Sequence, residues 1–253
     1  MSRNLLVRVA FAVPAIAVTV AVVWRGGWLM AGLLAALGVL GTREVYDFAR
    51  RQGVAPLAPL GYVGAAAIPL AAMWVLETDL LWVGPMLALG ALWLLAVLGV
   101  AAGARGPQGH PLSAVAVTVF GPLYASALPA FLIPIRHGVH SEAHPFASTA
   151  LVLFPLALTW ICDTCAMAGG TLVGGPKLAP VLSPHKTWAG AIAGVAGALA
   201  AALLLGRFVL DRLALHLPPA HLVLIGLVVA VAAQVGDVAE SLFKREVGLK
   251  DSS

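Results

Sequence analysis

The chain has 253 residues, of which 61% are hydrophobic and 10% are charged, and its mean hydropathy is +0.98. A water-soluble domain of this size does not need so much apolar sequence to fill its core, so the composition excludes a soluble protein and indicates an integral membrane protein. The formal net charge of +4 is a signal of membrane topology and of attraction to anionic lipid head groups, and it gives no case for nucleic-acid binding.

Near-continuous apolar stretches of about 20 residues recur along the sequence. Strands that cross a membrane as a barrel would alternate apolar and polar residues, so these stretches predict helices. We therefore expect an all-α fold, a polytopic membrane helical bundle. Its eight candidate spans are residues 5–24, 27–42, 56–76, 80–102, 112–134, 148–168, 187–206 and 220–237.

The first span also has features of a secretory signal peptide, because Arg3 and Arg8 precede its apolar core. The apolar stretch is long, however, and no small-x-small cleavage site follows before Trp24-Arg25. We expect a first helix that stays attached to the chain.

We treat residues 1–253 as a single membrane domain. Residues 1–110 have few polar groups inside their spans and are expected to form scaffold helices, whereas residues 111–253 carry the polar motifs. A patch at Thr42–Asp47 is short and weakly specific, and an anchor at the membrane interface would explain it.

A histidine-rich loop comes next along the chain, with His137, His140, His144 and Glu142 at a spacing that could bind a transition metal. The loop is short and lies apart from every other polar cluster. We expect a solvated loop there and no metal.

Polar residues gather in residues 163–190. Asp163 lies inside an apolar span, where a charge normally faces the bundle interior and marks a site. Ser183-Pro184 precedes Lys186-Thr187 at an expected helix start, so hydroxyl groups, free backbone N–H groups and an ammonium group would converge at the positive end of a helix dipole. Such helix ends bind phosphate well. Glycine pairs at 169–170 and 174–175 allow tight turns and a close approach to a ligand, although a plain re-entrant turn would also contain them.

Two other interpretations of this segment are weaker. The Walker A pattern fails because Pro176 interrupts the Gly-Lys step and Leu178 follows Lys177 where Ser or Thr would bind Mg²⁺. Cys162 and Cys165 have the spacing of a redox pair, but no thioredoxin-like pattern surrounds them, so we expect two small apolar residues.

The end of the chain holds the second polar cluster, in which Gln234, Asp237 and Glu240 follow the apolar stretch 221–233. At about 100° per residue, Asp237, Glu240, Ser241 and Lys244 fall within roughly 60° of one direction on a helix. That face can bind a metal and a phosphate together, since carboxylate oxygens suit Mg²⁺.

Both clusters resemble sequence blocks of one family, the phosphatidate cytidylyltransferases or CDP-diacylglycerol synthases. Ser-x-Phe-Lys-Arg-x-x-x-x-Lys-Asp-x-Ser, from Ser241 to Ser253, is similar to the opening of the family signature, and Asp163-Thr-x-Ala with the later Ser183-Pro-x-Lys-Thr-x-x-Gly190 is similar to a second block. The two blocks stand in the family's order and at about its separation. In the family the pattern continues into a His-Gly-Gly turn, an Asp-Arg-x-Asp run and a final membrane helix, so we expect a C-terminally truncated member that lacks one further helix.

The resemblance implies a reaction in which phosphatidic acid attacks the α-phosphorus of CTP to give CDP-diacylglycerol and pyrophosphate in phospholipid biosynthesis. It implies Mg²⁺ as cofactor, with two divalent ions in the full-length enzyme and a second metal carboxylate beyond Ser253, so the truncated chain is expected to be inactive. The implied catalytic residues are Asp163, Ser183, Lys186, Thr187, Lys244, Arg245 and Lys250. The implied substrate-binding residues are Ser241, Lys177 and Asp251. The implied metal ligands are Asp237 and Glu240.

Basic residues predict the orientation in the membrane. With the N-terminus cytoplasmic, the cytoplasmic side receives most of the 15 lysines and arginines, including those of both motifs, and the other side receives Arg25, Arg136, Arg207 and Arg212. We expect a multi-pass protein of the cytoplasmic (inner) membrane whose active-site loops face the cytoplasm. The sequence is compatible with a homodimer but does not fix the oligomeric state.

Two other functions stay open. A secondary transporter would use Asp163, Gln234 and Asp237 as an ion path near broken helices. Another CTP-dependent lipid enzyme, of the polyprenol-kinase type, would change the acceptor. Depth separates the first from the cytidylyltransferase, because a transporter places its polar groups near the middle of the bilayer.

Overall fold

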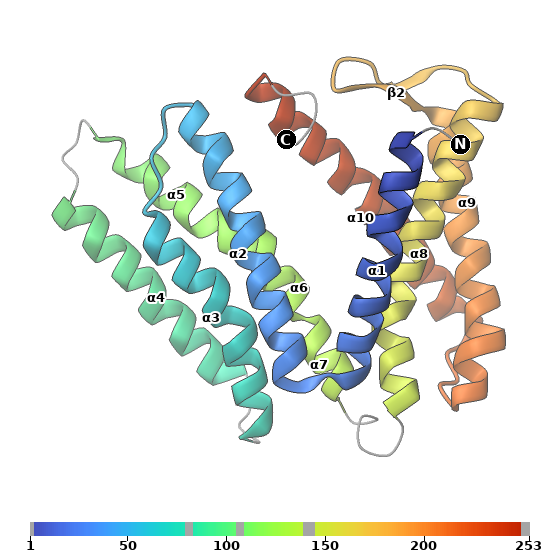
Figure 1. Cartoon of the computed structure of the whole chain (residues 1–253), viewed down its shortest axis with the longest axis horizontal. Helices are drawn as coiled ribbons and strands as arrows, with labels where there is room; N and C mark the ends of the chain where they lie inside the picture. Colours follow the sequence, from blue (N-terminus) through green and yellow to red (C-terminus); the bar gives the residue numbers. More distant parts are fainter. Residues whose placement is uncertain (1–2, 79–82, 105–108, 139–144, 249–253) are drawn as a thin grey trace. The chain divides into compact units, whose positions relative to one another are not determined.

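The computed structural model describes residues 3–78, 83–104, 109–138 and 145–248, and these residues form helices with one short hairpin (Figure 1). Seven helical runs among them are long and apolar enough to cross a membrane. The first expected span corresponds to helix α1 (Arg3–Arg25). The expected all-α, multi-pass membrane fold is confirmed. The chain divides into two compact units, Met1–Glu142 and Ala143–Ser253, which are described separately below.

The first unit contains the helices expected as scaffold and the next helical run as well. Helix α2 packs against α3 and α5, and α5 continues through a π-helical turn and two short helices. The elements are α1, α2 (Gly27–Arg51), α3 (Ala58–Glu77), α4 (Val83–Ala104), α5 (Pro111–Pro122), η2 (Leu123–Ala127), α6 (Leu128–Ala130) and α7 (Leu132–His137).

Tyr46 lies at the centre of this unit. Its side chain is fully buried, and its hydroxyl group donates a hydrogen bond to the carbonyl oxygen of Thr118 at 2.7 Å. Its ring occupies the space that side chains would fill at Gly61 and Gly121. An interfacial anchor is therefore the wrong explanation for this residue of the 42–47 patch, since Tyr46 joins α2, α3 and α5 inside the unit.

Arg136 and His137 hold the turn between α1 and α2. Arg136 donates hydrogen bonds to the carbonyl oxygens of Val23 at 2.7 Å and Trp24 at 2.6 Å, and His137 Nε2 accepts one from the backbone N–H of Gly27 at 2.8 Å. This histidine therefore has a structural partner. The other members of the histidine-rich loop, His140, Glu142 and His144, lie outside the described residues.

The second unit contains three long helices and the hairpin: α8 (Pro145–Leu172), β1 (Lys177–Ala179), β2 (Ser183–Thr187), α9 (Trp188–Leu205) with its continuation η3 (Gly206–Leu210) and η4 (Asp211–Leu213), and α10 (Pro219–Glu246). Strands β1 and β2 pair antiparallel, with Lys177 opposite Thr187. The glycine pairs in the sequence predicted only tight turns there and no strands. The turn into the hairpin uses Gly174 and Gly175, both with positive φ, which side chains would strain.

Small residues let α8 and α9 approach closely, as is common between membrane helices. A Cβ atom at Gly190 would lie 2.6 Å from the carbonyl oxygen of Ala166, and one at Gly194 would lie 3.0 Å from that of Cys162. Larger apolar residues, among them Phe154, Leu210 and Leu222, fill the core farther along the helices. The close contact places the C-terminal part of α8 beside the first turn of α9.

Candidate functional site

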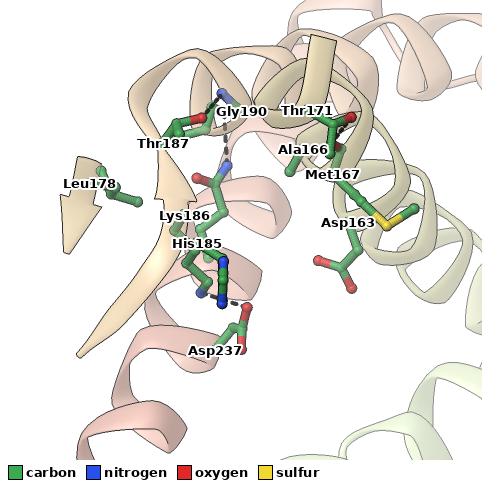
Figure 2. Close-up of a pocket in the computed structure, with 13 residues that line it drawn as sticks. Asp163, Ala166, Met167, Thr171, Leu178, His185, Lys186, Thr187, Gly190 and Asp237 are labelled. Carbon is green, nitrogen blue, oxygen red and sulfur yellow. Dashed lines mark hydrogen bonds and ion pairs between the residues drawn. The ribbon is translucent and has the colours of Figure 1, made fainter. Parts of the chain in front are cut away.

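A polar cavity of about 380 Å³ lies in the second unit where α8, the hairpin, α9 and α10 meet (Figure 2). We call it the polar cavity. Its lining includes two carboxylates, an ammonium group, an imidazole, two hydroxyl groups and an amide, contributed by elements far apart in the sequence. The lining residues are Asp163, Ala166, Met167, Gly170, Thr171, Leu178, His185, Lys186, Thr187, Gly190, Ala191, Gln234 and Asp237.

Lys186 of β2 and Asp237 of α10 form an ion pair in this cavity, with Nζ and Oδ2 2.5 Å apart. The aspartate side chain is 57% exposed and the lysine side chain 24%. An ion pair with so much solvent contact contributes about 0–1 kcal/mol to stability. Its charges are therefore available to a ligand, since exchanging one partner for another costs the fold little.

Asp163 brings a second carboxylate to the polar cavity from α8. Figure 2 shows the side chains of Asp163 and Asp237 pointing into the same space from different helices. Within the described part of the chain, Asp163 makes no hydrogen bond or ion pair that would occupy its carboxylate. The two acidic groups thus face one cavity that also holds Lys186.

Thr187 fixes the start of α9 at the cavity wall. It is the N-cap residue, and its buried hydroxyl oxygen accepts a hydrogen bond from the backbone N–H of Gly190 at 3.1 Å. The backbone N–H of Trp188 donates to the carbonyl oxygen of Pro176 at 3.0 Å, which ties the helix start to the hairpin. The positive end of the α9 dipole therefore lies at the cavity, as the sequence predicted.

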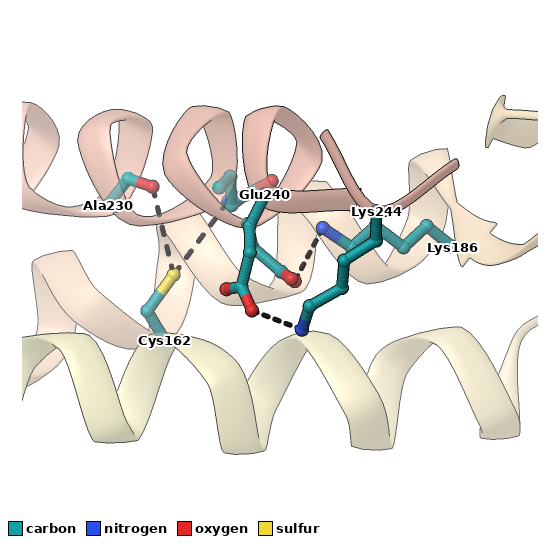
Figure 3. Close-up of polar contacts among 7 residues, drawn as sticks. Cys162, Lys186, Ala230, Glu240 and Lys244 are labelled. Carbon is teal, nitrogen blue, oxygen red and sulfur yellow. Dashed lines mark hydrogen bonds and ion pairs between the residues drawn. The ribbon is translucent and has the colours of Figure 1, made fainter. Parts of the chain in front are cut away.

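A smaller cavity of about 210 Å³ adjoins the polar cavity, because Asp237 and His185 line both. We call it the cationic cavity. Lys244 forms an ion pair with Glu240 one turn earlier on α10 (Figure 3), and Arg245 Nε donates to the carbonyl oxygen of Leu182 at 3.3 Å. Its lining residues are Leu182, Ser183, Pro184, His185, Asp237, Glu240, Ser241, Lys244 and Arg245.

Most of the predicted site residues thus meet at one of the two cavities. Asp163, Lys186, Thr187 and Asp237 meet at the polar cavity, and Ser183, Glu240, Ser241, Lys244 and Arg245 meet Asp237 at the cationic cavity. Lys177 has an exposed side chain on β1 and lines neither of these cavities. Lys250 and Asp251 lie outside the described residues.

Two residues at the cavities had been given no role in the predicted site. His185 lines both cavities, and its position between Pro184 and Lys186 in the Ser-Pro-x-Lys-Thr element was the available signal. Gln234 lines the polar cavity, and its amide nitrogen donates to the carbonyl oxygen of Ala191 at 3.1 Å. In the sequence, Gln234 stands out as a polar residue at the end of an apolar stretch.

In the described part of this unit, the possible metal ligands at the cavities are few and are mainly carboxylates of Asp and Glu. The described residues contain no cluster of three or more His, Cys, Asp or Glu side chains able to hold a metal ion. Asp163 and Asp237 share the polar cavity, whereas Glu240 lies at the cationic cavity beside Lys244. Mg²⁺ commonly binds one or two carboxylates and completes its shell with water and substrate phosphates, so the pair in the polar cavity suits that ion.

Comparison with known proteins relates this architecture to a family. Residues 6–253 match the family model described as the cytidylyltransferase family. The chain belongs to this family. It is 43% identical over 108 residues to a phosphatidate cytidylyltransferase of Brucella suis, an alignment that covers 43% of this chain and 38% of the relative. The chain therefore spans well under two thirds of the length of that relative.

Two longer alignments extend the similarity over most of the chain. A phosphatidate cytidylyltransferase of Synechocystis sp. is 29% identical over 266 residues, with 97% of this chain and 86% of the relative covered. The chloroplastic phosphatidate cytidylyltransferase 4 of Arabidopsis thaliana is 28% identical over 251 residues, with 91% and 62% covered. The chain is thus similar to bacterial and plant members that share this name.

Proposed function

We propose that the chain is a phosphatidate cytidylyltransferase, which condenses CTP with phosphatidic acid to CDP-diacylglycerol and pyrophosphate in phospholipid biosynthesis. The observation that carries the proposal is the convergence of Asp163, Lys186 and Asp237 on one cavity at the N-terminus of α9. Membership of the cytidylyltransferase family and the names of the similar proteins support it.

In the proposed reaction a phosphate oxygen of phosphatidic acid attacks the α-phosphorus of CTP. The bond from the α-phosphorus to its bridging oxygen breaks, and pyrophosphate leaves with the electron pair. Transfers of this kind depend on positioning and on neutralising crowded phosphates rather than on covalent help from the protein. Cations around the two adjoining cavities are suited to that task.

The basic residues at the two cavities have different proposed roles. Lys186 and the first turn of α9 neutralise charge at the reacting phosphates, and Lys244 and Arg245 at the cationic cavity hold the phosphates that leave. Thr187 keeps the helix start in place, and Ser183 and Ser241 offer hydroxyl donors. Lys177, Lys250 and Asp251 stay predictions from the family resemblance.

Mg²⁺ is the expected cofactor. Asp237 and Asp163 are the residues that would hold it at the polar cavity, and Glu240 is a further carboxylate next to the same helix face. When bound, the ion supplies positive charge that polarises the triphosphate toward attack.

The placement of the polar groups favours an enzyme over a transporter. The polar cavity is built from the C-terminal part of α8, the first residues of α9 and the second half of α10, so it lies toward one end of these helices. A transporter site is expected near the middle of the bilayer. We further propose that this end faces the cytoplasm in the inner membrane, where CTP is available, and that a homodimer is one assembly open to the chain.

The direct test uses the purified protein at its full natural length in mixed micelles with radiolabelled CTP, Mg²⁺ and phosphatidic acid. We expect CDP-diacylglycerol and pyrophosphate to form in equal amounts. CTP consumption with a polyprenol but not with phosphatidic acid would assign the chain to the other lipid enzyme. No turnover with either acceptor, together with ion flux in proteoliposomes, would support the transporter instead.

A further inference from the structure

A third cavity, of about 710 Å³, runs between α9 and α10, and we call it the apolar groove. Aliphatic side chains from both helices line most of it. Ile192, Val195 and Leu199 contribute from α9, and Val231, Val235 and Val238 contribute from α10. The groove adjoins the polar cavity, because Leu178, Ala191 and Gln234 line both.

The site therefore changes from charged to aliphatic across one set of shared residues. Gln234 lies at this boundary, where its amide nitrogen donates to the carbonyl oxygen of Ala191 at 3.1 Å and lies 3.8 Å from the sulfur of Cys162. On one side are Lys186, Asp163 and Asp237, and on the other are the valines of α10. A ligand that fills both spaces must have an anionic or polar end and an aliphatic end.

We propose that the apolar groove receives an acyl chain of the acceptor lipid while the phosphate of the same molecule lies in the polar cavity beside Lys186. The inference rests on the proposed function and adds where the lipid binds. CTP has no aliphatic part that could fill a groove of this composition. A phosphate monoester on two acyl chains matches both the charge of Lys186 and the aliphatic wall next to it.

The groove acts by positioning the lipid rather than by attracting it. Lipid tails are as apolar as the side chains of a membrane helix, so an acyl chain gains little free energy when it leaves the bilayer for the groove. A chain held between α9 and α10 does, however, direct its head group to the end of the groove, where the polar cavity begins. Holding two reactants in the right geometry removes part of the barrier to reaction.

Substitutions that fill the groove provide the first test. Ile192 is 66% exposed on α9 and lines the groove, so Ile192→Trp should obstruct it without disturbing the helix core. Leu204→Trp is the matched control, because Leu204 is 56% exposed on the same helix and lines none of the three cavities. We expect Ile192→Trp to raise the KM for dioleoyl phosphatidate about tenfold, the scale on which apolar pockets discriminate.

The KM for CTP should stay unchanged in both variants, and the KM for dihexanoyl phosphatidate, whose chains are short, should change little in Ile192→Trp. An equal KM for dioleoyl phosphatidate in wild type and Ile192→Trp would overturn the groove as the acyl site. A parallel rise in both variants would do the same, since it would report a general effect of a bulky residue.

Photochemical labelling provides a second test that needs no turnover. A phosphatidate with a diazirine near the middle of one acyl chain is irradiated with the wild-type chain in nanodiscs, and the labelled peptides are identified by mass spectrometry. We expect label on residues 188–199 and 231–238, loss of that label in Ile192→Trp, and competition by unlabelled phosphatidate. Equal labelling by a diazirine phosphatidylcholine would show that the groove holds ordinary bilayer lipid, and would overturn the proposal.

Crosslinks from the groove to residues 1–142, or to a second copy of the chain, would show that protein covers it and would also overturn the proposal. The acyl groove and the proposed reaction can be rejected separately. Specific labelling without CDP-diacylglycerol formation would retain the groove and reject the reaction. CDP-diacylglycerol formation without specific labelling would retain the reaction and reject the groove.

Discussion

The interior of the first unit and the cavities of the second unit use polar side chains in opposite ways. In the first unit, buried polar side chains bond to backbone carbonyl groups of neighbouring helices, as Tyr46 does to Thr118 and Ser126 does to Ala65 at 2.6 Å. In the second unit, charged side chains pair with one another at the edge of cavities, as Lys186 does with Asp237. A buried polar side chain that bonds to the backbone of a neighbouring helix therefore stabilises the bundle. A charged side chain that pairs with another exposed charge at a cavity is available to a ligand.

This contrast predicts large effects on activity from changes at the cavities and moderate effects on stability from changes at the buried hydrogen bonds. The largest effect is expected for Asp237→Asn, which keeps the shape of the side chain and removes the charge that faces Lys186 and the expected Mg²⁺. CDP-diacylglycerol formation should fall by at least about 10²-fold, the scale for loss of one electrostatic contact in an active site. Membrane insertion and thermal stability should stay close to wild type, since the exposed ion pair contributes little to folding.

Asp211→Asn is the matched control for this prediction. Asp211 also lies in the second unit, where it forms an ion pair with Arg207 at 3.1 Å and lies 3.2 Å from His216 Nδ1, but it lines neither the polar nor the cationic cavity. Its amide variant should retain activity. Near-normal turnover of Asp237→Asn with radiolabelled CTP would remove Asp237 from the proposed metal site.

Lys186→Ala and Lys244→Ala should give the next largest effects. Each removes an ammonium group from a different cavity, and losses of about 2–4 kcal/mol in transition-state stabilisation are usual for such contacts. The two variants should differ in kind, because we place Lys186 at the reacting phosphates and Lys244 at the leaving ones. Steady-state kinetics should show mainly a lower kcat for Lys186→Ala and mainly a higher KM for CTP in Lys244→Ala.

Unchanged kinetics in both lysine variants would leave these residues only the role of basic residues that orient the chain in the membrane. The same profile in both variants would reject the division of the phosphates between the two cavities. Arg212→Ala, which changes a basic residue of the second unit at η4 and at neither cavity, serves as the control for loss of positive charge.

Much of this arrangement could be predicted from the sequence. The length of the apolar runs predicted the helices, and polar residues in or next to apolar spans singled out Asp163 and Asp237. Lys186 was singled out by its place at an expected helix start, and the family resemblance implied that the three residues share one site. The helix face expected from the spacing of Asp237, Glu240 and Lys244 is present because α10 continues to Glu246, well past the expected end of the span at residue 237. The periodicity of apolar residues and the positions of charged residues are local properties, so they can be observed in a single sequence.

The features that were missed depend on contacts between distant segments. The hairpin of β1 and β2 is too short for a period-2 pattern, and its strands are separated by Pro180 and flanked by glycines. The bond from Tyr46 to Thr118 joins residues 72 positions apart, so nothing near Tyr46 in the sequence indicates its burial. The apolar groove likewise forms only when α9 and α10 lie side by side.

Gly190→Ala tests the close contact that positions the polar cavity. The added Cβ would lie 2.6 Å from the carbonyl oxygen of Ala166, so α8 and α9 must separate at the start of α9. We expect a loss of about 1–3 kcal/mol in stability, as for other overpacked sites, and a loss of activity. Gly236→Ala is the control, because no other part of the described structure lies within 4 Å of a Cβ at this α10 position.

Thermal unfolding in detergent, followed by size-exclusion chromatography, should separate the two glycine variants. Gly236→Ala should match or slightly exceed wild-type stability, since alanine is a better helix former than glycine by about 1 kcal/mol. An equally stable Gly190→Ala with full activity would show that the helix contact tolerates a side chain and does not set the geometry of the cavity.

The smallest effect is expected in the first unit, for Tyr46→Phe. The substitution keeps the ring between Gly61 and Gly121 and removes only the hydroxyl group that donates to the carbonyl oxygen of Thr118. Hydrogen bonds between membrane helices contribute about 0.6 kcal/mol on average and up to about 1.7, so a loss of about 1 kcal/mol is expected in a buried position. Thermal unfolding should show a correspondingly small decrease in Tm for Tyr46→Phe.

The KM for CTP and for phosphatidic acid should not change in Tyr46→Phe, because all the residues of the proposed site lie in the second unit. A KM change in Tyr46→Phe at a temperature where the variant is fully folded would show that the first unit also shapes the site, and the division between structural and ligand-binding polar groups would then no longer follow the division of the chain into two units.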